Sequence, residues 1–258
     1  MTNINGLVQS LARAPKDTDP VVVGANFARA AKAPWVEAVH INSSLAGSGR
    51  SRTPAAKVAP IFTDTAHTTL PIEYQGREIV MEAHAYEDDS ASYQAMALVY
   101  RRPGNKDAPF VRVHSGCVTG DIFHSLRCDC YQQLQKALDT VVESHNGIIL
   151  YLPYHEGRGI GLVAKMKAYA QQDNGLDTVD ANLAIGAPVD ARDYELAAKI
   201  LKDLKATDIR LLTNNPLKVD AMRAYGINVS EQVPHVIEAS SYNERYLNTK
   251  RERMAHKI

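Results

Sequence analysis

The sequence lacks a charge imbalance and long apolar runs. Its 258 residues carry 29 Lys and Arg against 29 Asp and Glu, so no overall field attracts the molecule to nucleic acid or to an anionic membrane surface. Apolar patches such as segment 148–152 are short, far below the roughly 18–20 residues that span a bilayer. Segment 1–15 is polar and has no apolar signal-peptide core. These absences predict a cytoplasmic protein with neither a nucleic-acid nor a membrane partner.

Cysteine is also scarce, but its placement is informative. The three cysteines are Cys117, Cys128 and Cys130, and there is no fourth one to complete a closed four-cysteine zinc site. Clustered thiolates suit zinc, so either a histidine, His114 or His124, or a water completes the site. With water the site is catalytic, because the metal lowers the pKa of water and makes hydroxide available near neutral pH. The alternative is three small side chains buried in the core.

The hydrophobic pattern changes its period along the chain. Alternating apolar residues predict strands at 77–83, 94–101 and 110–114, the last two joined as a hairpin-like unit by the breaker at 103–105. Beyond the cysteines, helical stripes at 134–142, 160–172, 196–204 and 216–225 alternate with short strands at 148–152, 209–212 and 227–229. We therefore expect an α/β fold (mixed α+β), with an antiparallel β section followed by a βαβ-type layered C-terminal half.

Two loops after predicted strands suit an anion. The loop from Glu156 to Gly161 opens a helix, where glycines allow close approach and the helix N-terminus favours negative charge. Its G-x-G-x-G spacing differs from the dinucleotide-binding fingerprint. Thr213, at the end of another strand, and Lys218, in the first turn of the next helix, would also hold a phosphate. Both loops also fit ordinary strand-to-helix turns, and taken alone Asp190 and Arg192 fit solvated surface charges.

A series of short motifs has a characteristic order and spacing. The motifs are Arg112 to Ser115, Thr119 to Asp121, Ser125 to Cys130, Glu156 to Leu162, Lys167 to Ala170, Asp177 to Val179 and Leu211 to Pro216. Together they resemble GTP cyclohydrolase II, and the tail from Asn243 to Met254 is similar to that family's C-terminal segment. The resemblance covers roughly residues 95–256. We accordingly divide the chain into an N-terminal extension of unknown role, residues 1–75, and a GTP cyclohydrolase II-like catalytic domain, residues 76–258.

The resemblance implies an enzyme of riboflavin synthesis. Such an enzyme hydrolyses GTP, opens its imidazole ring and releases formate and pyrophosphate, leaving a diaminopyrimidine ribosyl phosphate. It would bind one Zn²⁺ per chain, with Mg²⁺ on the triphosphate, and form a homodimer. Two alternatives stay open: a paralogue that acts on another purine nucleotide or in pyrimidine catabolism, and a non-catalytic zinc-containing regulator that binds nucleotides. Retention of Tyr169, Asp190 and Arg192 together favours an enzyme over a regulator.

The resemblance also implies a role for each matching position. Cys117, Cys128 and Cys130 match the zinc ligands. The positions that match GTP-binding residues are Arg112, Val113, His114, Ser115, Gly116, Gln133, Glu156, Gly157, Arg158, Thr178, Thr213 and Lys218. Asp190 matches the proton acceptor, Arg192 the nucleophile toward the α-phosphate, and Tyr169 a tyrosine of the ring-opening and deformylation chemistry. The assignment of Arg192 as a nucleophile rests wholly on the family resemblance, because a guanidinium is normally protonated.

Two departures from the family pattern border the expected base and ribose site. Gly116 stands where the family usually has a glutamate before the first zinc cysteine. Pro153, Tyr154 and His155 stand where the family usually reads Arg-Gln, and the segment is one residue longer. These departures bear on the identity of the substrate more than on the metal chemistry.

Overall fold

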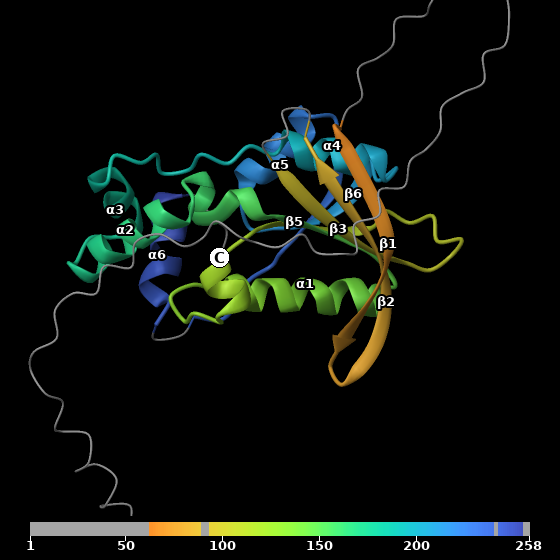
Figure 1. Cartoon of the computed structure of the whole chain (residues 1–258), viewed down its shortest axis with the longest axis horizontal. Coiled ribbons are helices and arrows are strands. Elements are labelled where there is room, and N and C mark those ends of the chain that lie inside the picture. The colour runs from red at the N-terminus through yellow and green to blue at the C-terminus, as the bar shows by residue number, and fades with distance from the viewer. Residues whose placement is uncertain (1–61, 89–92, 240–241, 255–258) are drawn as a thin grey trace, which may run out of the picture. The chain divides into compact units, whose positions relative to one another are not determined.

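The computed structural model of the protein describes residues 62–88, 93–239 and 242–254 (Figure 1). Residues 1–61 of the expected N-terminal extension therefore lie outside the described residues. The strands are β1 (Asp64–Tyr74), β2 (Arg77–Glu87), β3 (Gln94–Arg101), β4 (Phe110–Ser115), β5 (Asn146–Leu152), β6 (Asp208–Leu212) and β7 (Asn228–Val233). In the described part of the chain they form a seven-stranded sheet in the order β1-β2-β3-β5-β4-β6-β7.

The helices all follow β4 along the described chain. They are α1 (Cys130–Ser144), α2 (Leu162–Asp173), α3 (Thr178–Ala184), α4 (Glu195–Asp203), α5 (Pro216–Ala224) and α6 (Glu244–Arg253), with a π-helical turn η2 (Val118–Ile122) and a 3-10 segment η3 (Pro153–Gly159). Helix α5 begins as its sequence predicts, because the Asn215 side chain accepts a hydrogen bond from the backbone N–H of Leu217 and Pro216 occupies the first turn.

The sheet is antiparallel at one edge and parallel at the other, which confirms the predicted fold class. Strands β1, β2, β3 and β5 pair antiparallel, whereas β4 pairs parallel with both β5 and β6, and β6 pairs parallel with β7. The predicted hairpin of residues 94–101 with 110–114 is wrong, because β5 lies between β3 and β4. The turn at 103–105 instead begins a connection to the parallel half, where β4, α1 and β5 form a βαβ unit.

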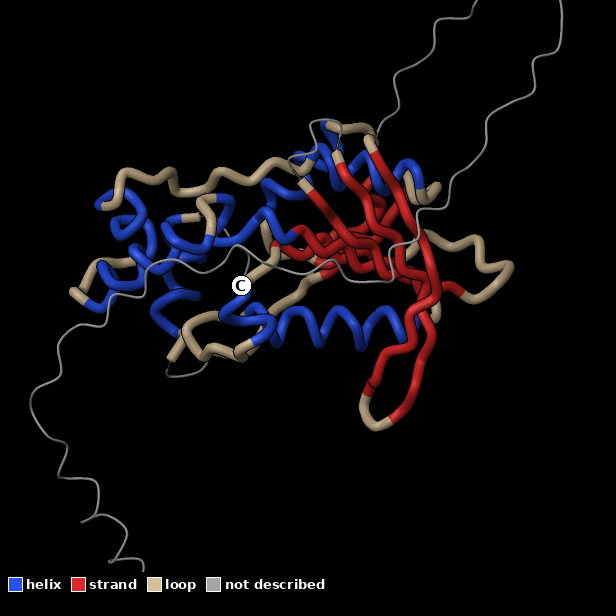
Figure 2. The backbone as a smooth tube through the Cα atoms, in the orientation of Figure 1, coloured by secondary structure: helices blue, strands red, loops and turns tan. Residues whose placement is uncertain are grey.

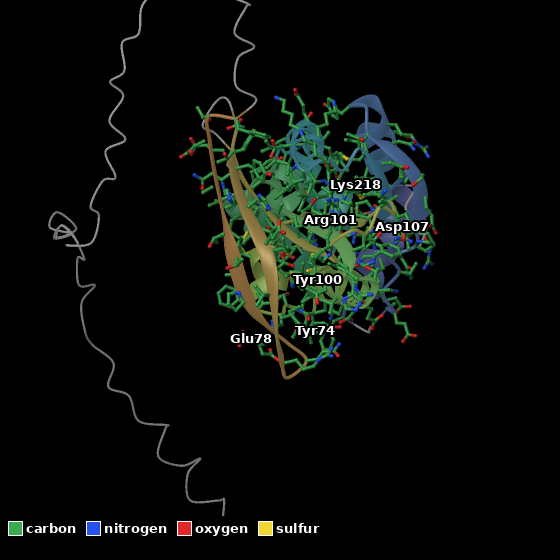
Figure 3. All side chains as sticks on the ribbon, turned by 90° about the vertical axis from the view of Figure 1, so that its right-hand side faces the viewer. Tyr74, Glu78, Tyr100, Arg101, Asp107 and Lys218 are labelled. Carbon is green, nitrogen blue, oxygen red and sulfur yellow. The ribbon has the colours of Figure 1, made fainter. Side chains whose placement is uncertain are left out.

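Helices cover both faces of the sheet (Figure 2). On one face α4 and α5 pack against Ile148, Leu150 and Leu152 of β5, together with neighbouring strands. On the other face α1 packs through Val141 and Val142 against Ile149. Tyr74 and Tyr100, both labelled in Figure 3, belong to the cluster under α1. Successive side chains of β5 point to opposite faces of the sheet and pack under different helices, so the strand is buried on both faces.

Strand β1 lies inside the segment 1–75, for which the sequence predicts no role. It pairs with β2 from Asp64 to Tyr74, so the sheet extends to the N-terminal side of residue 76. Helices α3 and α6 are likewise absent from the sequence-based prediction. In the described ranges, none of the helices combines the length and apolarity needed to cross a membrane.

In the parallel half of the sheet, the strands that follow β4 along the chain lie on opposite sides of it. From β4 the chain passes through α1 to β5 on one side, whereas β6 lies on the other side of β4. Loops at the carboxyl ends of such strands diverge to opposite faces and leave a crevice, the usual place of a ligand in an open α/β sheet. The segments 116–117, 153–158 and 213–215 follow these three strand ends.

Candidate functional site

An open cavity lies at these carboxyl ends, and its empty space of about 1060 Å³ includes the adjoining solvent. Most of the residues that the sequence analysis singled out line it: Arg112, His114, Ser115, Gly116, Cys117, Cys128, Cys130, Gln133, Glu156, Gly157, Arg158, Tyr169, Thr178, Arg192, Thr213 and Lys218. Val113 and Asp190 do not line the cavity but contact residues that do, as described below. The sequence therefore predicted which residues come together, and their individual roles stay predictions.

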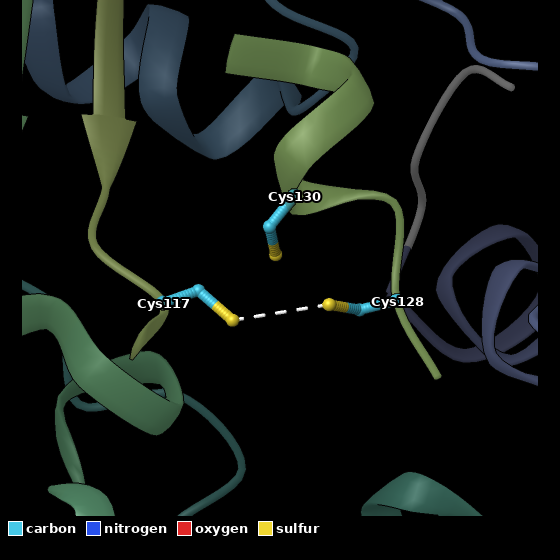
Figure 4. Close-up of side chains that lie close together, drawn as sticks. All are labelled: Cys117, Cys128 and Cys130. Atoms are coloured by element: carbon cyan, nitrogen blue, oxygen red, sulfur yellow. Dashed lines mark hydrogen bonds between the residues drawn. The ribbon is translucent and has the colours of Figure 1, made fainter. Parts of the chain in front are cut away.

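The three cysteines converge at one wall of the cavity, where Figure 4 shows their sulfur atoms turned toward one another. The Sγ atoms of Cys117 and Cys128 are 3.8 Å apart, and all three sulfur atoms lie within 4.8 Å of one another. Tetrahedral zinc with Zn–S bonds of about 2.3 Å places two sulfur ligands roughly 3.8 Å apart. A Cβ at Gly120 would lie 2.9 Å from Cys128 Sγ, so only glycine leaves room for this convergence.

Neither candidate histidine belongs to the cluster. Among the described residues, the group of potential metal ligands consists of the three cysteines alone. His114 Nε2 instead lies 3.1 Å from the carboxylate of Asp121, which also accepts hydrogen bonds from the Cys117 backbone N–H and the Tyr151 hydroxyl. The His124 ring packs at a tilt against the Tyr131 ring, with the centroids 3.9 Å apart. A metal in this site would thus have three protein ligands from the described chain, and a fourth position for a small molecule.

Lys165 of α2 contacts the cysteine cluster directly. Its Nζ donates hydrogen bonds to Cys117 Sγ at 3.0 Å and to Thr119 Oγ1 at 2.8 Å. Hydrogen bonds from Cys128 and Cys130, together with the Lys165 ammonium, lower the pKa of Cys117. The hydrogen bond with Cys117 raises the pKa of Cys128 to about 11. The Lys165 ammonium therefore favours the thiolate form of Cys117, and a bound metal would displace the remaining thiol protons of the cluster.

Glu156 connects the loop after β5 to the cysteine loop. Its carboxylate accepts hydrogen bonds from the Lys165 ammonium at 2.7 Å and from the backbone N–H groups of Val118 at 2.7 Å and Gly157 at 3.0 Å. The next two residues have left-handed backbones, with φ of 61° at Gly157 and 64° at Arg158. This geometry presents Arg158 to the cavity at a conformational cost that non-glycine residues usually avoid.

Arg112, Arg192 and Lys218 form a cationic wall of the same cavity. Burial lowers the pKa of Arg112 to about 10. Burial also lowers the pKa of Lys218, and the charges of Arg112 and Arg192 add to this effect. The Lys218 ammonium donates a hydrogen bond to the Val113 carbonyl oxygen at 2.7 Å. Cations that destabilise one another in a cavity are stabilised by an anionic ligand, so this wall suits phosphate groups.

Asp190 holds the Arg192 guanidinium in place. Its carboxylate accepts hydrogen bonds from Nε of Arg192 at 2.8 Å and from the Arg192 backbone N–H at 3.1 Å, and a salt bridge to Nη2 completes the contact. Although burial opposes the charge of Asp190, these bonds keep its pKa below the usual value. Both groups are therefore charged, and the guanidinium faces the cavity with its remaining N–H groups.

Tyr169 lies one helical turn after Lys165 on α2 and lines the cavity. The Lys165 ammonium is 5.6 Å from the centre of its ring, and the Arg127 guanidinium is 4.9 Å from it. The phenol thus shares one wall with the cysteine cluster, where it could exchange a proton with a bound molecule.

Several residues of the site were not predicted from the sequence. The principal ones are Lys165, Asp129 and Lys250, and the Lys250 ammonium of α6 lies 2.8 Å from the carboxylate of Asp129, between two of the cysteines. Asn182 and Met254 also line the cavity. The spacing of Lys165 and Tyr169, four residues apart on a predicted helix, is the signal that would have identified the lysine. Lys250 gives no such signal, because its partner is distant in sequence.

The two departures from the family pattern touch each other. A Cβ at Gly116 would lie 2.9 Å from the Cα atom of Pro153 and 3.1 Å from the backbone oxygen of Leu152. Any side chain at position 116 therefore requires a different path of the backbone after β5. His155, from the same segment, lines the cavity as well.

A thiol cluster and a cationic wall that line one cavity, at the ends of parallel strands, have the organisation of an enzyme active site. A family model described as GTP cyclohydrolase II matches residues 63–234. The GTP cyclohydrolase-2 of Streptomyces coelicolor is 49% identical over 191 residues, which are 74% of this chain and 84% of that protein. The chain belongs to the GTP cyclohydrolase II family, a family of hydrolases, as its motifs predicted.

Other relatives are longer proteins. The riboflavin biosynthesis protein RibBA of Nocardia farcinica is 49% identical over 176 residues, 68% of this chain and 42% of that protein. The RibBA of Salinispora tropica is 50% identical over 171 residues, 66% of this chain and 43% of that protein. The chain thus spans less than half the length of these riboflavin biosynthesis proteins.

Proposed function

We propose that this protein hydrolyses GTP, opening the imidazole ring and releasing formate and pyrophosphate, as the first step of riboflavin synthesis. The observation that supports this most is the shared cavity, which places the three-cysteine cluster and the cationic wall within reach of one ligand. Ring opening and loss of pyrophosphate occur at opposite ends of a nucleoside triphosphate. Ring opening at the purine requires an activated water, whereas loss of pyrophosphate from the triphosphate requires positive charge.

The cysteine cluster would hold one zinc ion through Cys117, Cys128 and Cys130. Its soft thiol donors and the 3.8 Å spacing of Cys117 and Cys128 Sγ fit that ion. When bound, zinc supplies Lewis acidity that activates water near neutral pH for attack at C8 of the purine. Lys165 would keep Cys117 deprotonated and ready for the metal.

The remaining residues would bind and orient GTP. The cationic wall, with Arg158 and Thr213, would bind the triphosphate together with Mg²⁺. Gln133 and the strand end from Val113 to Gly116 would position the nucleoside. Tyr169 would exchange a proton with a ring nitrogen as the C–N bond breaks. The assignments of Asp190 as proton acceptor and Arg192 as nucleophile stay predictions from the family.

The test is to incubate the purified protein with Zn²⁺, Mg²⁺ and GTP and to follow formate and pyrophosphate separately. We expect both products, and we expect Cys128→Ser to lose both bound zinc and formate release. Full zinc content in Cys128→Ser by elemental analysis would contradict the metal assignment. Binding of GTP without either product would instead identify a regulator, and release of formate from another purine nucleotide in preference to GTP would identify a paralogue.

The expected homodimer and cytoplasmic location also stay proposals. Size measurement by light scattering tests the first, and fractionation of the source cells tests the second.

A further inference from the structure

Tyr194 is a buried tyrosine beside the cationic wall. The residue is 6% exposed and precedes α4 as its N-cap. The Lys218 ammonium lies over its ring, 5.4 Å from the centroid, and the Arg192 guanidinium lies 6.0 Å from the same centroid. An aromatic ring attracts a cation within about 6 Å through the negative potential of its face. One tyrosine therefore interacts with two of the three cations of the wall.

Lys218 is surrounded by charges of its own sign. The cations near it are Arg112 on β4, Arg192 in the loop before α4 and Lys250 on α6. The charge of Asp190 acts in the opposite sense, but Arg192 already binds that carboxylate through its Nε and its backbone N–H. Burial and the neighbouring cations together lower the pKa of Lys218. The ammonium thus needs a further source of stabilisation to stay charged.

The histidines near Lys218 do not supply that stabilisation. They are His114 on β4 and His155 in η3. Burial lowers the pKa of His114, and it lowers the pKa of His155 to about 4. Both rings are therefore neutral near pH 7 and carry no charge that could compensate the ammonium. The Val113 carbonyl oxygen accepts a hydrogen bond from the ammonium at 2.7 Å, but it is a neutral group.

The face of an aromatic ring stabilises a cation without cancelling its charge. Burial raises the pKa of Tyr194, so the phenol is neutral and the ring acts through its face. A carboxylate in the same place would pair with Lys218 and compete with a phosphate for it. The ring leaves the net charge of the wall unchanged, and its attraction for a cation is stronger at a site shielded from water.

We propose that Tyr194 is a positioning residue whose ring face keeps Lys218 charged and holds Lys218 and Arg192 in place for the phosphate groups of the substrate. The proposal rests on the proposed function for the identity of that substrate, a nucleoside triphosphate. Tyr194 is not one of the described residues that line the cavity. It therefore acts through the two cations and not on the substrate directly.

Fluorinated phenylalanine separates the effect of the ring face from the effect of the ring's shape. Tyr194→Phe keeps the face, whereas trifluorophenylalanine at position 194 has nearly the same shape and a much weaker negative potential. Calorimetry of tripolyphosphate binding to the purified protein, between about pH 6 and 10, shows where binding weakens as Lys218 loses its proton. We expect the midpoint of this loss to lie about 0.5–1.5 pH units lower with trifluorophenylalanine than with phenylalanine.

The matched control is the same pair of substitutions at Tyr86. That residue belongs to the same core cluster and is 3% exposed, and its hydroxyl donates a hydrogen bond to Asp203 at 3.0 Å. Phenylalanine and trifluorophenylalanine at position 86 change a buried ring in the same way. We expect them to give equal midpoints, because Tyr86 does not belong to the surroundings of Lys218.

The result at position 194 decides the proposal. Equal midpoints for phenylalanine and trifluorophenylalanine there overturn it, and so does a shift of the same size at position 86. A protein that does not bind tripolyphosphate, or whose binding does not weaken with rising pH, also overturns it. The assay requires no turnover. The expected shift in a protein that releases neither formate nor pyrophosphate from GTP overturns the proposed function alone, whereas turnover of GTP without the shift overturns this inference alone.

Discussion

The buried pair of Lys165 and Glu156 gives a quantitative prediction for stability. Their side chains are only 8% and 9% exposed, and the ammonium lies 2.7 Å from the carboxylate. Lys165→Met keeps the length and apolar stem of the side chain but removes the charge. The substitution leaves the Glu156 carboxylate buried without its cation, and Cys117 Sγ and Thr119 Oγ1 lose a donor.

Removing one partner of a buried ion pair costs about 3–5 kcal/mol in free energy of unfolding. Glu156 still accepts hydrogen bonds from the backbone N–H groups of Val118 and Gly157, so the loss in Lys165→Met should be at the lower end, about 3 kcal/mol. In the double variant with Glu156→Gln no charge of the pair is left unpaired. Its loss should therefore be about 2 kcal/mol smaller than the sum of the two single losses.

Urea unfolding of the metal-free protein and its three variants measures this coupling. Work without metal separates the ion pair from any change in zinc binding at Cys117. The matched control is the pair of Lys199 and Glu195, spaced i,i+4 on α4 with side chains 31% and 53% exposed, for which a coupling of about 0.3–0.5 kcal/mol is expected. A coupling for Lys165 and Glu156 no larger than that of the control would refute the reasoning.

Three further predictions concern the chemistry and pH dependence. Cys130→Ser should lose formate release but keep pyrophosphate release, because the cationic wall does not involve the cysteine; equal loss of both products, followed in one assay, would contradict this. Tyr169→Phe should bind GTP within a few-fold of the unsubstituted protein yet open the ring far more slowly, and unchanged turnover would remove the phenol from the mechanism. Burial, with Arg112 adding, lowers the pKa of His235 to about 3. The unfolded chain therefore binds a proton at higher pH than the folded one, and stability should fall as pH drops from about 6.5 toward 3, by about 1.4 kcal/mol per pH unit for this group. His235→Gln should flatten the curve in that window, and an identical pH dependence in urea unfolding would contradict the assignment.

Local sequence patterns predicted the positions of helices and strands better than they predicted which strands pair. The apolar stripe of α1 and the cap at Asn215 are properties of short segments, and both were found correctly. The hairpin between β3 and β4 was wrong because a Pro-Gly turn shows that a strand ends and not which strand pairs with it. Strand β1 was missed because most of its residues are exposed and Pro71 lies inside it, as is tolerated at a sheet edge.

Contacts between distant segments were also the part of the site that the sequence did not predict. Cys117, Arg112 and Thr213 were predicted together because they match the family's motifs. In the structure each lies at or near the carboxyl end of a parallel strand, and those ends share one edge of the sheet. The pairs of Lys165 with Glu156 and of Lys250 with Asp129 depend on how α2 and α6 pack. No periodicity in the sequence encodes that packing, so these contacts could not be predicted.

The contact between Gly116 and Pro153 constrains how this site can be altered. A chain that carries a side chain at position 116 must carry a different backbone path at position 153, because the two places compete for the same space. The two positions should therefore vary together among related chains. An attempt to redesign nucleobase selectivity by introducing a carboxylate at 116 must replace the loop at 153–155 in the same step.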